Sequence, residues 1–150
     1  MSAKTNGKVY IILLREKPQE ANMNQKGAKT ERELVHLFWA QEWAACRVAG
    51  SGRQNYPAPD VIANKQGINL AIECKATKAE SQYLEKREVE ELKAYAARAG
   101  ARALIALRFN NTPWIFLNPE DLDETPSSFV ATKEKAQLRG TTFEQLTKHL

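Results

Sequence analysis

The sequence predicts an α/β fold with a mixed central β-sheet flanked by helices. Apolar residues recur with a helical period in some segments and with the alternating period of a strand in others. These segments follow one another as helix, three strands, helix and two strands, ahead of a mixed tail, an order that fits such a sheet. The 150 residues are 43% hydrophobic and 27% charged, which is typical of one globular domain with its own core.

A first helix is predicted over residues 26–43. Its pattern, at i, i+3, i+4 and i+7, consists of Leu34, Leu37, Phe38 and Gln41. The first residue of this helix is uncertain by several positions. Thr30 and Glu33 could form a capping box, whereas Asn24 could cap a helix that begins earlier.

Residues 1–25 differ from the rest of the chain. Residues 9–14 form an apolar run that fits a strand or a short helix, and the polar residues 17–25, which include a proline, are interpreted as a linker. We therefore expect an N-terminal extension at 1–25 and a single folded domain at 26–150.

The remaining elements follow from alternation and turn residues. Strands are predicted at residues 44–49, 60–64, 68–75, 103–109, 114–117 and 129–132. A turn at 65–67 joins the second and third of them into a hairpin. Further helices are predicted at 85–99, where Gly100 is a stop signal, and at 141–150.

Composition and charge exclude some classes of protein. The longest apolar run, 9–14, is far below the ~20 residues that a membrane span needs, so we expect an intracellular, cytoplasmic protein without a membrane partner. Cys46 and Cys74 are too few for a disulfide framework and are interpreted as buried, reduced thiols. A net charge of +4 suits a polyanionic partner, although many soluble proteins share it.

The chemistry is predicted in the hairpin. Pro59-Asp60 is followed, after twelve residues, by Glu73-Cys74-Lys75, the pattern PD…(D/E)xK. Alternation along the strand places Glu73 and Lys75 on one face, and Asp60 opens the neighbouring strand within reach of Glu73.

Two carboxylates that converge repel each other unless a hard cation lies between them. With the main-chain carbonyl of Cys74 they would form an oxygen ligand set for Mg²⁺, for which Mn²⁺ would substitute. Such a metal supports phosphodiester hydrolysis, with Lys75 positioning water or offsetting phosphate charge. The alternative is a strand with a solvated, salt-bridged edge, and a second ExK copy at 91–93 shows that the short motif alone is weak.

Glu31 has an unusual helical phase. It precedes Leu34, Val35 and Phe38 by three, four and seven positions, which places its carboxylate on the core-facing side. A carboxylate on the core-facing side of a helix indicates that a partner group contacts it there.

Four ordered segments make the chain resemble the archaeal-type Holliday junction resolvases of the restriction-endonuclease-like superfamily. The segments are residues 26–34, 47–52, 59–63 and 70–78. The resemblance implies a homodimer that binds four-way DNA junctions and nicks two strands symmetrically, without a small-molecule cofactor.

The resemblance also implies roles for single residues. Glu31 matches a catalytic, metal-site glutamate, and Arg32 matches a basic residue beside that glutamate. Ser51 matches a serine at the edge of the active site. Tyr95 matches an aromatic residue of the dimer interface, whereas Ala99 stands where another aromatic is expected.

Basic residues flank these motifs in sequence. Their side chains could bind DNA phosphates, or they could simply be solvated at the surface. The residues interpreted as DNA-binding are Lys26, Lys29, Arg32, Arg53 and Lys78. Two rival functions also stay open at this point. One is a repair or restriction nuclease of the same superfamily, and the other is a junction-binding protein without activity.

Overall fold

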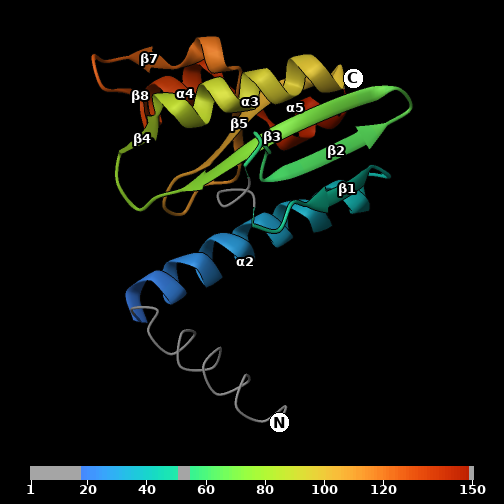
Figure 1. The fold of residues 1–150 in the computed structure, drawn as a ribbon, viewed down its shortest axis with the longest axis horizontal. Helices are drawn as coiled ribbons and strands as arrows, with labels where there is room; N and C mark the ends of the chain where they lie inside the picture. The colour runs from blue at the N-terminus through green and yellow to red at the C-terminus, as the bar shows by residue number, and fades with distance from the viewer. Residues whose placement is uncertain (1–17, 51–54, 149–150) are drawn as a thin grey trace, which may run out of the picture.

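The structure is a computed structural model that describes residues 18–50 and 55–148, with side chains from residue 27 onward (Figure 1). Its helices are α2 (Pro18–Ala40), α3 (Lys86–Ala99), α4 (Lys133–Arg139), α5 (Phe143–Lys148) and the 3₁₀ turn η2 (Pro119–Asp121). Its strands are β1 (Ala44–Arg47), β2 (Val61–Lys65), β3 (Ile68–Ala76), β4 (Ser81–Glu85), β5 (Arg102–Arg108), β6 (Ile115–Leu117), β7 (Asp123–Glu124), β8 (Ser128–Thr132) and β9 (Thr141–Thr142).

Six strands form a central sheet in the order β1-β2-β3-β5-β6-β9. The β3–β5 pair is parallel and the other pairs are antiparallel, because α3 lies in the crossover between β3 and β5 whereas β2 and β3 are joined by a tight turn. Gln66 and Gly67 in that turn have φ of 47° and 85°. The predicted mixed sheet and its hairpin are confirmed.

Helices cover both faces of this sheet (Figure 1). On one face, Leu34 and Phe38 of α2 pack against alternate residues of β3, including Leu70 and Ile72. On the other face, Val89, Leu92 and Ala96 of α3 pack over Ala71. The apolar alternation along β3 therefore divides the core into two layers, one on each side of the strand that carries the predicted site.

A second sheet, β4-β8-β7, was not expected from the sequence. The strand predicted at 129–132 exists as β8, and it pairs with β4 and β7, outside the central sheet. The predicted C-terminal helix is present as α5, preceded by β9, and α4 was missed. Both β7 and β9 have only two residues, too few for a periodic pattern.

The linker predicted at 17–25 is wrong for the part that the structure describes, because α2 already begins at Pro18. Proline is favoured in the first turn of a helix, where its missing N–H breaks no hydrogen bond. The helix ends at Ala40, and Trp43 follows a turn in which Glu42 has φ of 64°. The run at 9–14 lies outside the described residues, and the domain boundary near residue 26 stays a prediction.

In the part of the chain that the structure describes, no helix combines the length and apolar character that a bilayer crossing requires.

Candidate active site

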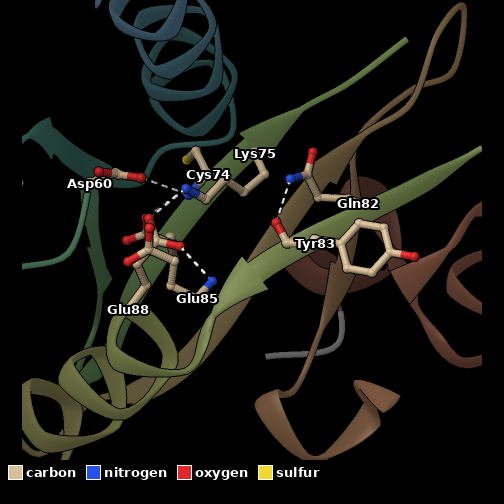
Figure 2. A network of polar contacts seen from close by, with 8 residues as sticks. Asp60, Cys74, Lys75, Gln82, Tyr83, Glu85 and Glu88 are labelled. Carbon is tan, nitrogen blue, oxygen red and sulfur yellow. Dashed lines mark hydrogen bonds and ion pairs between the residues drawn. The ribbon is translucent and has the colours of Figure 1, made fainter. Parts of the chain in front are cut away.

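Asp60 immediately precedes β2 and lies beside Glu73 and Cys74, near the end of β3. The β2–β3 register ends with the pair Val61 and Ile72, so Asp60 and Glu73 are the next residues beyond it. The Asp60 N–H donates to the Ile72 carbonyl at 3.0 Å, and the Cys74 N–H donates to Asp60 Oδ2 at 2.9 Å. Figure 2 shows the Asp60 carboxylate directed at this main-chain nitrogen. The backbone of β3 thus fixes the orientation of the Asp60 side chain.

Glu73 is the most perturbed carboxylate of the site. Its side chain is only 13% exposed, and burial, followed by the charge of Asp60, raises its pKa from 4.5 to about 9. A hydrogen bond with Asp60 and the charge of Glu88 act in the same direction, whereas Lys75 opposes them. Two carboxylates in hydrogen-bonding contact need either a shared proton or a cation between them. Of these two, the cation was predicted from the sequence.

Glu31 reaches the same place from α2. Its side chain is 16% exposed, and burial and then the charge of Asp60 raise its pKa above 4.5. The Arg47 side chain lowers that pKa, since its Nε donates to Glu31 Oε2 at 2.6 Å. The core-facing phase expected for Glu31 is confirmed. Its ion pair with Arg47 was not predicted, because it depends on how α2 packs against β1.

Lys75 lies between two carboxylates. Its ammonium nitrogen is 2.7 Å from Glu88 Oε1 and 3.8 Å from Glu73 Oε1. Burial lowers the pKa of Lys75, but the hydrogen bond with Glu88 and the charges of Glu88, Glu73 and Asp60 outweigh it, so the pKa is raised above 10.5. Glu88, in the first turn of α3, was missed by the sequence reasoning.

The other predicted residues differ in exposure, and some of them lie outside the described residues. Lys29 and Arg32 are exposed on α2, and Lys78 is exposed just after β3. Tyr95 is half-buried and packs against the core layer under α3. Ser51, Arg53 and the side chain of Lys26 lie outside the described residues. One expectation is corrected: Cys46 is exposed, because β1 is an edge strand of the sheet.

The donor set suits a hard divalent cation. In the part of the chain that is described, no three side chains of His, Cys, Asp or Glu are close enough to form a complete metal cluster. Asp60 and Glu73 do supply two converging carboxylates. The N–H and C=O of one strand residue point to the same side, so the Cys74 carbonyl faces the side on which its N–H meets Asp60. Two carboxylates, one carbonyl and water form an oxygen environment of the kind that Mg²⁺ prefers.

A helix-flanked mixed sheet that presents Asp60, Glu73 and Lys75 from a hairpin is the arrangement of PD-(D/E)xK nucleases. A family model described as archaeal Holliday junction resolvase (Hjc) matches residues 22–150. The chain belongs to this family.

Similar proteins support the assignment. The crossover junction endodeoxyribonuclease Hjc of Archaeoglobus fulgidus is 39% identical over 107 residues, which are 71% of this chain and 79% of that protein. The Hjc of Methanocaldococcus jannaschii is 31% identical over 106 residues, 71% of this chain and 75% of that protein. A solved structure of Archaeoglobus fulgidus Hjc is described as a Holliday junction resolvase from an archaeal hyperthermophile. It matches this chain with a TM-score of 0.74 and 34% sequence identity. The match covers 81% of this chain and 95% of that one. The predicted family, fold class and nuclease activity are confirmed.

Proposed function

We propose that this chain resolves four-way DNA junctions by hydrolysing one phosphodiester bond in each of two strands, with Asp60, Glu73 and Lys75 as the centre of each active site. The observation that carries the proposal is the convergence of these three side chains at the start of β2 and the end of β3. Membership of a junction resolvase family supports the substrate. The relatives named crossover junction endodeoxyribonuclease support the reaction.

Asp60, Glu73 and the Cys74 carbonyl would hold Mg²⁺, with Mn²⁺ as a substitute. Glu31 of α2, which pairs with Arg47 and forms no three-residue ligand group with them among the described residues, would have to move toward the cation to become a further ligand. These residues would hold a cation that would supply Lewis-acid polarisation of the scissile phosphate and would lower the pKa of a nearby water. The protein prepares this site in advance, because the Cys74 N–H holds the Asp60 carboxylate in place. Arg47 holds Glu31 in the same way and keeps part of the negative charge balanced.

Lys75 is the cation that the chain itself supplies. From its place beside Glu73 it can orient a water for attack on phosphorus, or donate a proton toward a phosphate oxygen as charge accumulates there. Ser51 lies outside the described residues, and its role at the edge of the site rests on the family resemblance alone. The carboxylates, and not a covalent nucleophile, carry the reaction.

Lys29, Arg32 and Lys78 are exposed basic residues suited to bind DNA phosphates, and Lys26 and Arg53 extend the same group in sequence. Paired symmetric nicks need two active sites related by a two-fold axis, so we assign the active form as a homodimer with Tyr95 near its interface. We also place the protein in the cytoplasm, where recombining DNA is present in cells without a nucleus.

The substrate class is tested with a synthetic four-way junction whose strands carry separate labels. In Mg²⁺ the protein should nick two opposing strands at symmetric positions and leave ligatable duplexes. A linear duplex and a flap of the same sequence serve as comparators, and both should be cleaved at least tenfold more slowly. Equal rates on all three would favour a repair or restriction nuclease, and no cleavage with Mg²⁺ or Mn²⁺ would favour a binding protein without activity.

A further inference from the structure

The ammonium of Lys75 is shared unequally between two carboxylates. It contacts Glu88 Oε1 at 2.7 Å, whereas Glu73 Oε1 is 3.8 Å away. The side chains of Lys75 and Glu88 are 27% and 29% exposed, so water screens their attraction less than it screens an ion pair on the open surface. Glu88 is therefore the carboxylate that determines where the ammonium lies.

Glu88 is itself fixed by the start of its helix. Its second oxygen, Oε2, accepts a hydrogen bond from the backbone N–H of Glu85 at 3.1 Å. Glu85 ends β4, and Val89, which follows Glu88, is fully buried in the core layer under α3. One oxygen of Glu88 is thus held by the backbone while the other holds Lys75 (Figure 2).

This arrangement affects the metal site directly. If Lys75 lacked Glu88, its nearest remaining anionic partner would be Glu73, which already lies 3.8 Å away. A close ion pair there would occupy a carboxylate oxygen that a cation needs, and it would displace the ammonium from the place where it meets the phosphate. Glu88 keeps Lys75 beside Glu73 without letting it bind there.

We propose that Glu88 is a positioning residue for the nuclease reaction: it holds the Lys75 ammonium at the edge of the site and keeps the Glu73 carboxylate available for the divalent cation. The proposal rests on the function proposed above for Lys75. It assigns no contact between Glu88 and DNA or metal, and the residue acts through Lys75.

The test is Glu88→Gln, which keeps the side-chain length and an oxygen that can accept from the Glu85 N–H. We expect the single-turnover cleavage rate at saturating junction to fall roughly tenfold to a hundredfold, as is usual when a catalytic group is misplaced. Junction affinity without metal should stay within twofold of the unchanged protein. Calorimetric titration of the protein without DNA should show weaker Mg²⁺ binding, a change that loss of helix stability alone would not cause. Glu88→Asp, which restores the carboxylate, should recover part of both losses.

The matched control is Glu90→Gln, the same change on the same helix. The Glu90 side chain is 63% exposed and pairs only loosely with Lys93, at 3.5 Å, so its rate should stay within twofold. Cleavage by Glu88→Gln within twofold of the unchanged protein would overturn the proposal, as would a loss of rate with undiminished Mg²⁺ binding. Lys75→Met distinguishes a wrong role for Lys75 from a wrong role for Glu88. If that variant is fully active, the role of Lys75 itself is wrong, whereas an inactive Lys75→Met beside an active Glu88→Gln removes only the role of Glu88.

Discussion

The carboxylate of Glu73 makes the metal-free site electrostatically unfavourable at neutral pH. Burial and the neighbouring Asp60 raise its pKa to about 9, whereas in the unfolded chain it is near 4.5. Between these two pH values the folded protein holds a proton that the unfolded chain has released. The free energy of unfolding therefore decreases as pH rises through this window.

The corresponding prediction is that Glu73→Gln stabilises the metal-free protein at pH 8. We expect a gain of about 2 kcal/mol, which is roughly 4–8 °C in Tm for a domain of this size, and little gain at pH 4. Millimolar Mg²⁺ should raise the Tm of the unchanged protein much more than that of the variant. Thermal unfolding at both pH values measures these effects, with Glu90→Gln as the exposed control. A variant that is less stable at pH 8 would contradict the like-charge description of the site.

Several site residues were predictable because their signals are local. Strand alternation placed Glu73 and Lys75 on one face, the turn at 65–67 brought Asp60 to them, and helical phase directed Glu31 inward. The partners Arg47 and Glu88 were not predictable in this way. Each meets its carboxylate or ammonium only after elements from different parts of the chain have packed together.

At the scale of elements, the connection between α4 and β9 packs closely because Gly140 has no side chain. A Cβ at Gly140 would lie 2.3 Å from Ile115 Cγ2 and 2.5 Å from the Ala136 carbonyl oxygen. Gly140 does not have a positive φ, so the constraint is close packing and not backbone conformation. The C-terminal segment is thereby held tightly against β6.

Gly140→Ala should therefore destabilise the protein by about 1–3 kcal/mol, the usual cost of overpacking a filled core. The matched control is Gly27→Ala in α2, where nothing lies within 4 Å of a new Cβ. That change should be neutral or should stabilise the helix by about 0.5–1 kcal/mol. Urea unfolding of the two variants measures the difference, and an equal effect at both positions would contradict the packing around Gly140.

The elements show where sequence reasoning fails. Long periodic segments such as α3 and β5 were found with nearly correct bounds, whereas α4 and the second sheet were not. Two-residue strands carry no period, and their pairing is decided by distant partners. The first turns of α2 are not predictable from periodicity, because the polar residues from 18 to 25 lack an apolar period. They have no strong helix breaker after Pro18, so they still form a helix.

At the scale of the whole molecule, binding to a junction should depend strongly on salt. Each Lys or Arg that neutralises a phosphate adds to the slope of log affinity against log salt, by about 0.9 per contact. Lys29→Ala and Lys78→Ala should each weaken binding at low salt and reduce that slope by roughly two, because the proposed homodimer carries two copies of each lysine. Lys135 of α4 is the control, since it pairs with Asp123 at 2.6 Å in the second sheet, and its alanine variant should leave the slope unchanged. Fluorescence anisotropy over a range of salt concentrations measures this, and equal slopes for all variants would remove Lys29 and Lys78 from the DNA interface.

In the proposed reaction, Asp60 and Glu73 form the cation site at which a four-way junction is cut. The most direct measurement compares cleavage and binding of one labelled junction by the unchanged protein, Asp60→Asn and Glu73→Gln. Each substitution should reduce Mg²⁺-dependent cleavage by roughly a thousandfold or more, while junction affinity changes by less than about threefold. Undiminished cleavage by both variants would exclude Asp60 and Glu73 from the cation site.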